Sequence, residues 1–282
     1  MDSPVTAAYQ DLERRFRRLA LIGDASGFLA WDRAAIMPRG GAESRAEQLT
    51  ELGLIRHEMV TDATLGEALD AAEAGDAGLD PWQRANLVAM RRKWRHANAV
   101  PAALHEALSR AGLACEMAWR EARPNNDFAT LRPLLETVIA LVRETASLKG
   151  EAFGCTPYDA LLDQFEPGLR AADIDPVFDD LAAFLPDFID DVLVRQGQAP
   201  AIIEPAGPFP EARQRALGED LMKRVGFPFD SGRLDVSHHP FSGGTPDDLR
   251  ITTRYDEADF TSSLMAVLHE TGHALYEFNL PT

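Results

Sequence analysis

The sequence contains little cysteine and no long apolar segment. Its two cysteines, Cys115 and Cys155, lie far apart, and neither belongs to a CxxC motif or has histidines at metal-ligand spacing. This usage predicts reduced, buried thiols rather than a disulfide framework. No run approaches the roughly 18 apolar residues that a membrane-spanning helix requires, so we expect no membrane segment.

Positive charge is also scarce. Lys and Arg number 28 against 45 Asp and Glu, which gives a formal charge of -17 at pH 7 and a pI near 4.8. A field of this sign repels nucleic acid and anionic membrane surfaces, and both are excluded as partners. The N-terminal segment MDSPVTAAYQDLERRFRRLA carries charges throughout and lacks the apolar core of a signal peptide, which favours a cytoplasmic location.

Helical periodicity dominates most of the chain. Apolar positions such as Leu12, Phe16 and Leu19 recur at three- and four-residue steps. Asp80 followed by Pro81 is typical of a helix N-terminus. Helices are expected at about 5–30, 42–74, 81–97, 101–122, 127–150, 157–165, 173–196 (broken or kinked at Pro186) and 211–225.

The composition changes in the last fifth of the chain. Segments 233–237 and 249–255 are rich in β-branched residues, which predicts two strands. The glycine- and proline-rich segment 239–246 between them predicts a loop. Asp259 is expected to cap a final helix at 260–278. These patterns predict a mainly α fold with a small β element before its last helix.

The last helix contains an HExxH motif, formed by His269, Glu270 and His273. Residues four apart on a helix lie one turn above each other, so the two imidazoles can converge on one divalent cation. Glu270 is rotated by about 100° from His269 and can accept a proton from a metal-bound water that attacks a carbonyl carbon. The spacing predicts a metal site with a general base, although HExxH also occurs in helices that merely expose two histidines.

The residues around the motif favour the metal site. An apolar turn precedes it, which predicts a buried helix whose histidines line an internal cleft. Gly272 costs the helix roughly 1 kcal/mol relative to alanine, which suggests that substrate or a neighbouring backbone packs closely against it. The strand 249–255 lies a short loop before the helix, and we expect it to be an edge strand that pairs with extended substrate.

Three ordered motifs resemble those of one peptidase family. HPF at 239–241, DxRxT at 248–252 and HExxH at 269–273 have the order and spacing of the carboxypeptidase Taq family. The segments FLAWDRAAIMPRGGAESRAEQL and YDALLDQFEPG are similar as well, so the resemblance covers the whole chain. It implies a largely helical, zincin-like fold and a cytosolic, usually homodimeric, metal-dependent enzyme that removes single residues from peptide C-termini.

The resemblance also implies two ligands of zinc or cobalt, one general base and two residues of the substrate groove. The ligands are His269 and His273, and the general base is Glu270. The residues of the substrate groove are His239 and Arg250. From the residues alone, Arg250 suits either a substrate carboxylate or an ion pair with Asp248 or Asp256. His239 either contacts substrate or anchors its loop.

The third metal ligand is expected to be absent from this chain. A catalytic zinc usually takes three protein ligands. In the family the third is a glutamate of an HES-type motif on a later helix, and only nine residues follow His273. Glu277, the one carboxylate among them, lies a further turn away and is expected not to be a ligand. We therefore expect the first half or slightly more of a family member, with weak metal binding and little activity by itself.

The composition allows one large domain or two modest ones. Hydrophobic residues at 45% and charged residues at 26% of the 282 are ordinary for a globular protein. We expect one continuous, truncated domain, made of a helical N-terminal region over 1–200 and the start of a catalytic region over 201–282. A metallocarboxypeptidase acting on peptides is the preferred interpretation. The alternatives are a non-catalytic helical dimerisation or peptide-binding domain, and an aminopeptidase or endopeptidase with the same HExxH.

Overall fold

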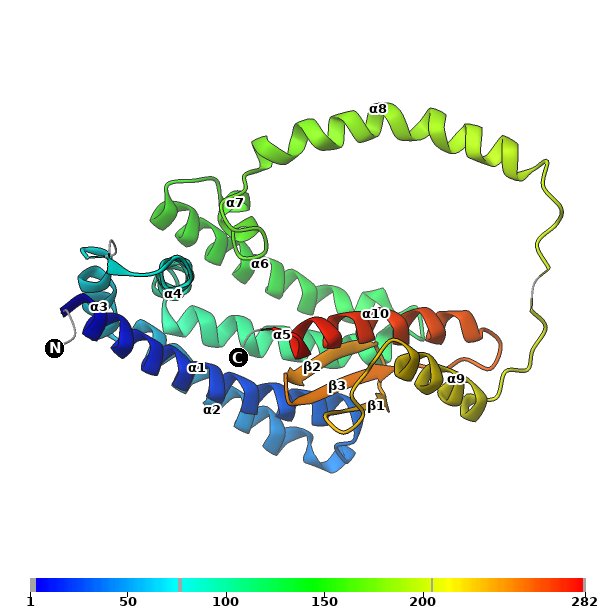
Figure 1. Ribbon diagram of the computed structural model, residues 1–282, viewed down its shortest axis with the longest axis horizontal. Helices are drawn as coiled ribbons and strands as arrows, with labels where there is room; N and C mark the ends of the chain where they lie inside the picture. The colour runs from blue at the N-terminus through cyan, green and yellow to red at the C-terminus, as the bar shows by residue number, and fades with distance from the viewer. Residues whose placement is uncertain (1–3, 76–77, 204, 281–282) are drawn as a thin grey trace. The chain divides into compact units, whose positions relative to one another are not determined.

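The computed structural model describes residues 4–75, 78–203 and 205–280, and most of them are helical (Figure 1). The helices are α1 (Pro4–Ala35), the 3-10 helix η1 (Arg39–Gly41), α2 (Ala42–Thr61), α3 (Ala63–Glu73), α4 (Pro81–Asn98), α5 (Ala102–Ala122), α6 (Phe128–Phe153), α7 (Pro157–Leu162), α8 (Ala171–Gln196), α9 (Glu211–Arg224) and α10 (Phe260–Phe278). The strands are β1 (Gly232–Val236), β2 (Phe241–Thr245) and β3 (Asp248–Thr253). The predicted mainly α fold with a small β element before the last helix is confirmed.

The chain divides into two compact units. Unit 1 comprises Met1–Arg15 and His57–Ile202, and unit 2 comprises Phe16–Arg56 and Ile203–Thr282. One division between the units lies at Ile202–Ile203. Sequence patterns gave no sign that Phe16–Arg56 groups with the C-terminal part, because helical periodicity does not say which surface a helix covers.

The core of unit 2 lies where α10 packs against α9 and against strands β2 and β3 (Figure 1). Its buried side chains are Met222, Phe227, Leu234, Leu249, Ile251, Val267 and Ala274. Burying one side chain of this size stabilises the fold by about 1.5–3 kcal/mol. Gly218 on α9 faces Val267 on α10, and a Cβ there would make an ordinary contact at 3.5 Å. This packing fixes the HExxH helix against the sheet.

The strand order is β1-β3-β2. Strand β3 pairs in parallel with β1, with Leu234 opposite Ile251, and antiparallel with β2, with Phe241 opposite Thr252. The expectation that the strand at 249–255 is an edge strand is therefore wrong, because β3 is central. The edge strand beside the HExxH helix is β2, which lies within the segment predicted to be a loop.

Glycine explains why β2 was not predicted. Gly243 and Gly244 lower the strand propensity of the segment. Gly244 has a φ of +96°, and a Cβ there would lie 2.0 Å from the carbonyl oxygen of Asp248. Glycine is thus required for a tight hairpin to β3, where a composition-based prediction sees only a breaker.

Helix N-termini are the best-predicted boundaries. Asp80 caps α4 in a capping box with Gln83, and Asp127 accepts a hydrogen bond from the N–H of Thr130 at the start of α6. The helix predicted at 42–74 is instead two helices, because Asp62 accepts from the N–H of a following threonine and starts α3. The predicted break at Pro186 does not occur, and α8 continues through it.

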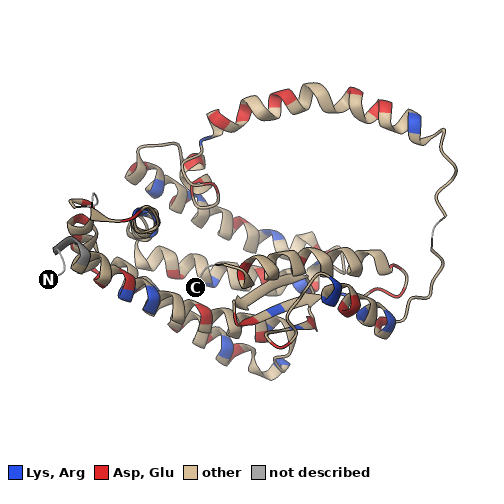
Figure 2. Ribbon diagram, in the orientation of Figure 1, with Lys and Arg blue, Asp and Glu red and all other residues tan. Residues whose placement is uncertain are grey.

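Helix α8 has no buried residue in the structure, and Figure 2 shows acidic residues along much of its length. None of the described helices combines the length and apolar character needed to cross a membrane. Cys115 and Cys155 are free thiols, as predicted, but both are half-buried rather than fully buried.

Candidate metal centre

The first turn of α10 is held by its cap and by α9. Asp259 accepts a hydrogen bond from the N–H of Thr261 at 2.9 Å, which caps the helix. Ser263 Oγ donates to the buried Gln214 Oε1 at 2.6 Å, and Gln214 Nε2 donates to the carbonyl of Asp256 at 2.7 Å. These bonds set the direction of the helix that carries the motif.

The buried stripe of α10 determines where the motif points. Its members recur at three- and four-residue steps: Ser263, Val267, Glu270, Thr271 and Ala274. His269 lies two residues after Val267, a rotation of about 200°, so it is exposed, as is His273. Of the two histidines expected to line an internal cleft, His273 lines the cavity described below, and His269 is not among its described lining residues. Glu270 is only 9% exposed.

The two imidazoles converge. His269 Nε2 and His273 Nε2 lie 3.2 Å apart, with ring centroids 4.7 Å apart and ring planes at 85°. Two nitrogen ligands of a tetrahedral zinc, each at 2.0–2.1 Å, are separated by about 3.3 Å. The pair therefore fits a single divalent cation. Within the described residues, no group of three or more His, Cys, Asp or Glu is arranged to hold a metal ion.

A cavity of about 470 Å³ adjoins this pair. Its walls come from the HPF segment, strand β2 and helix α10, and they include His239, Glu270, His273 and Glu277. The volume is in the range of small-molecule pockets. One predicted ligand, the predicted base and the predicted groove residue His239 thus share one cavity, although they lie up to 34 positions apart in the sequence.

The loop that carries His239 is held by hydrogen bonds to Thr252, which is fully buried. Thr252 Oγ1 accepts from the N–H of Phe241 at 3.1 Å and from Ser237 Oγ at 2.8 Å. Ser237 Oγ also lies 2.6 Å from the carbonyl oxygen of His239. The threonine of DxRxT therefore positions the HPF segment, which gives the two motifs a shared structural role.

Arg250 makes a bidentate ion pair rather than facing the cavity. Its Nε and Nη2 lie 2.5 and 2.6 Å from the carboxylate of Asp248. The guanidinium carbon lies 4.5 Å from the ring centroid of Trp31 and 5.3 Å from that of Phe28. Arg250 is not among the described residues that line the cavity. This geometry favours the ion-pair alternative, because two N–H groups of the guanidinium already bind the carboxylate of Asp248.

The close packing expected against Gly272 is not found among the described residues. Gly272 is exposed, and a Cβ there would meet no described atom within 4 Å. The expectation of a neighbouring backbone at this position is therefore wrong, because Gly272 lies between the two histidines on the exposed side of α10.

Sequence reasoning missed two residues that shape the site. Gly244 permits the hairpin that makes β2 a wall of the cavity, and Thr252 holds the HPF segment. The glycine pair was visible but indicated a loop. Thr252 was visible as part of the DxRxT motif, but its role as a support depends on the pairing of β3 with β2, which the sequence does not reveal.

A helix that presents HExxH beside an antiparallel edge strand defines the class of HExxH metallopeptidases. Within that class, the carboxypeptidase Taq (M32) metallopeptidase family matches residues 11–282, and the chain belongs to this family.

Relatives of known name agree with this assignment. The chain is 37% identical to thermostable carboxypeptidase 1 of Thermus thermophilus, over 98% of this chain and 56% of the relative, and 33% identical to thermostable carboxypeptidase 1 of Pyrococcus furiosus, over 93% and 52%. Its structure resembles that of Trypanosoma cruzi metallocarboxypeptidase 1 with a TM-score of 0.89 and 38% identity, over 98% of this chain and 55% of that one. The chain thus spans about half the length of the relatives it matches.

Proposed function

We propose that this chain provides two histidine ligands of the metal ion and the general base of a carboxypeptidase that releases single residues from peptide C-termini. The observation that carries the proposal is the 3.2 Å approach of His269 Nε2 and His273 Nε2 beside a cavity that Glu270 also lines. Family membership supports the carboxypeptidase activity and a divalent metal. The spacing of the imidazoles suits zinc, and cobalt has similar ligand preferences.

Each residue has a role that follows from its position. The two imidazoles hold the cation, which when bound supplies the Lewis acidity that activates water. Glu270 points into the same cavity from the buried stripe of α10 and accepts the proton of the attacking water. Its burial limits the solvent around the carboxylate, so the proton transfer occurs at a defined position.

The free edge of β2 provides a place for the substrate backbone. Among the described strands, β2 pairs with β3 on one side only, and residues 242–245 line the cavity. A peptide in extended conformation can therefore add to the sheet at β2 and direct its C-terminal residue toward the two histidines. His239 lies in the wall of the same cavity, where it contacts the bound peptide.

We assign Arg250 a positioning role. The ion pair with Asp248 and the contact with Trp31 hold β3 in place, and β3 carries the threonine that supports the HPF segment. A cation for the substrate carboxylate is then required from another residue.

The proposal is tested with a blocked dipeptide and its C-terminal amide, assayed with added zinc or cobalt. Slow release from the free acid and none from the amide are expected of this chain by itself, because its described residues supply two imidazoles rather than three ligands. Glu270→Gln is expected to lower the rate by about 10²–10⁴-fold with unchanged metal content, whereas His269→Ala and His273→Ala lose the metal. His238→Ala, an exposed histidine outside the cavity walls, is the matched control. Equal cleavage of the amide would contradict a carboxypeptidase.

A second candidate is a helical domain that binds peptide or a partner chain without turnover. The observation that favours it is that the described residues supply two imidazoles, whereas catalytic zinc sites usually have three protein ligands. Metal content distinguishes the two candidates. In the second, His269→Ala alters neither metal content nor peptide release and changes stability alone.

We also propose that the protein is cytoplasmic and forms a homodimer. It is supported by what the resemblance to the family implies. Light scattering after size-exclusion chromatography gives the mass directly. A mass of one chain at micromolar concentration would contradict the dimer.

A further inference from the structure

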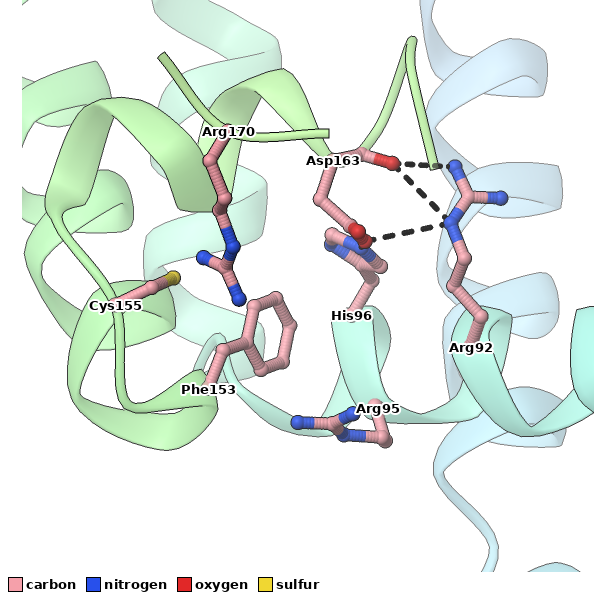
Figure 3. Close-up of a pocket in the computed structure, with 7 residues that line it drawn as sticks. All are labelled: Arg92, Arg95, His96, Phe153, Cys155, Asp163 and Arg170. Carbon is pink, nitrogen blue, oxygen red and sulfur yellow. Dashed lines mark hydrogen bonds and ion pairs between the residues drawn. The ribbon is translucent and has the colours of Figure 1, made fainter. Parts of the chain in front are cut away.

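A second cavity, of about 90 Å³, lies in unit 1 (Figure 3). Helix α4 contributes three side chains, the end of α6 contributes Phe153, and the segments that flank α7 contribute the rest. The lining residues are Arg92, Arg95, His96, Phe153, Cys155, Asp163 and Arg170. The volume holds several water molecules or one small anion. None of these residues belongs to the HExxH helix or to the sheet.

The one acidic residue of this cavity is already engaged. Asp163 Oδ2 lies 2.7 Å from His96 Nε2, and the backbone oxygen of Asp163 accepts from Arg92 Nη2 at 2.6 Å. Asp163 Oδ1 accepts from the N–H of Gly168 at 2.9 Å. Burial acts to raise the pKa of Asp163, but these hydrogen bonds and the nearby Arg92 outweigh it and lower the pKa, so the carboxylate is ionised at neutral pH. Arg92, His96 and Asp163 thus form a closed network.

Two guanidinium groups of the cavity have no ion-pair partner among the described residues. The Arg95 guanidinium lies over Phe153, 4.8 Å from the ring centroid, and Figure 3 shows Arg170 extending toward Cys155 and the same ring. Neither guanidinium lies within ion-pair distance of a described carboxylate, although a hydrogen bond with Cys155 and then the charges of Asp159 and Asp163 raise the pKa of Arg170.

The surroundings add to this positive charge. Lys149 is buried, and its Nζ donates to the neutral Gln164 Oε1 at 3.0 Å rather than to a carboxylate. Burial lowers the pKa of Lys149, and the charge of Asp163 opposes this shift only in part. Burial also lowers the pKa of His96, so its ring is neutral at pH 7 and serves to support Asp163.

We propose that the cavity binds one small oxyanion, a phosphate or a carboxylate, between Arg95 and Arg170. Guanidinium groups present paired N–H donors that match the oxygens of either group. Phe153 holds the Arg95 guanidinium in place through its ring face, and the Arg92 network fixes the wall opposite. The site is preorganised for an anion in a chain whose overall charge would otherwise repel one.

The test is thermal unfolding and titration calorimetry of the 282-residue protein in phosphate, acetate or chloride at equal ionic strength. At about five times its Kd, phosphate is expected to raise the Tm by about 2–4 °C relative to chloride. A response to acetate as large as that to phosphate assigns the site to carboxylates, and a response to phosphate alone assigns it to phosphates.

The variants locate the effect. Arg95→Gln with Arg170→Gln is expected to abolish the anion-dependent shift and the heat of binding, whereas Arg95→Lys with Arg170→Lys retains part of both. Arg132→Gln, which removes an exposed arginine paired with Glu136 on α6, is the control and keeps the full response. Circular dichroism verifies that each variant is folded. The proposal is overturned if neither oxyanion differs from chloride, or if the double Gln variant responds like the unmodified protein.

Discussion

At the residue scale, the geometry of the site depends on the two histidines and on two supporting residues, Gly244 and Thr252. His269 and His273 approach to 3.2 Å only because α10 places them one turn apart on its exposed side. Gly244 and Thr252 act indirectly, the first through the backbone conformation it allows and the second through its hydroxyl.

Gly244→Ala is expected to destabilise unit 2 by about 3 kcal/mol. The φ of +96° strains any L side chain, and the new Cβ would lie 2.0 Å from the carbonyl oxygen of Asp248. Gly243→Ala is the control, since a Cβ there would meet no described atom within 4 Å, and a change below about 1 kcal/mol is expected. Urea unfolding measures both. Equal stability of the two variants would show that the hairpin does not require glycine.

At the element scale, the central strand β3 organises the site. It pairs with both other strands, its Arg250 forms an ion pair with Asp248, and its Thr252 supports the HPF segment. The edge strand β2 and the helix α10 then form the walls of the cavity. The DxRxT motif thus acts as a support, and residues of the HPF and HExxH motifs line the cavity.

Thr252→Val is expected to destabilise the protein by about 1–3 kcal/mol. Loss of the hydroxyl leaves the N–H of Phe241 and Ser237 Oγ without this buried acceptor. Amide exchange at Phe241 is expected to accelerate along with the loss of stability. Thr253→Val is the matched control, because Thr253 Oγ1 is buried without a hydrogen-bond partner among the described atoms. That variant is expected to be neutral or more stable, and a loss equal to that of Thr252→Val would refute the assigned role.

At the whole-molecule scale, acidic residues determine how stability varies with pH. The helix caps Asp62, Asp127 and Asp259 have pKa values below their ordinary value, because threonine hydroxyls and then backbone N–H groups donate to each carboxylate. A folded-state pKa below the unfolded value stabilises the fold above about pH 4, and this contribution is lost as the pH falls through the lowered values. The net charge of -17 at pH 7 acts in the opposite direction, since self-repulsion decreases as the pH approaches the pI of about 4.8.

The Tm is therefore expected to hold or rise from pH 7 to about 5 and to fall below about pH 4. Circular dichroism melts across this range measure the profile. The triple variant Asp62→Asn, Asp127→Asn and Asp259→Asn keeps caps of similar quality that do not titrate, and its acid limb is expected to be shallower. Acid limbs of identical steepness in the two proteins would exclude the caps as the cause.

The sequence by itself determined the features that depend on near neighbours along the chain. Helix starts at Asp80, Asp127 and Asp259 were predictable because a capping side chain bonds to an N–H two or three residues ahead. The four-residue spacing of HExxH likewise required the two imidazoles to share one side of a helix.

Only the tertiary structure decided which surfaces meet. It placed Phe16–Arg56 with the C-terminal unit, made β2 rather than β3 the edge strand, and occupied Arg250 with Asp248. These outcomes depend on pairings between distant segments, and a hydrophobic or β-branched pattern records that a face is buried without recording its partner. The exposure of the histidines was decided in the same way, because α9 and the sheet cover the opposite side of α10.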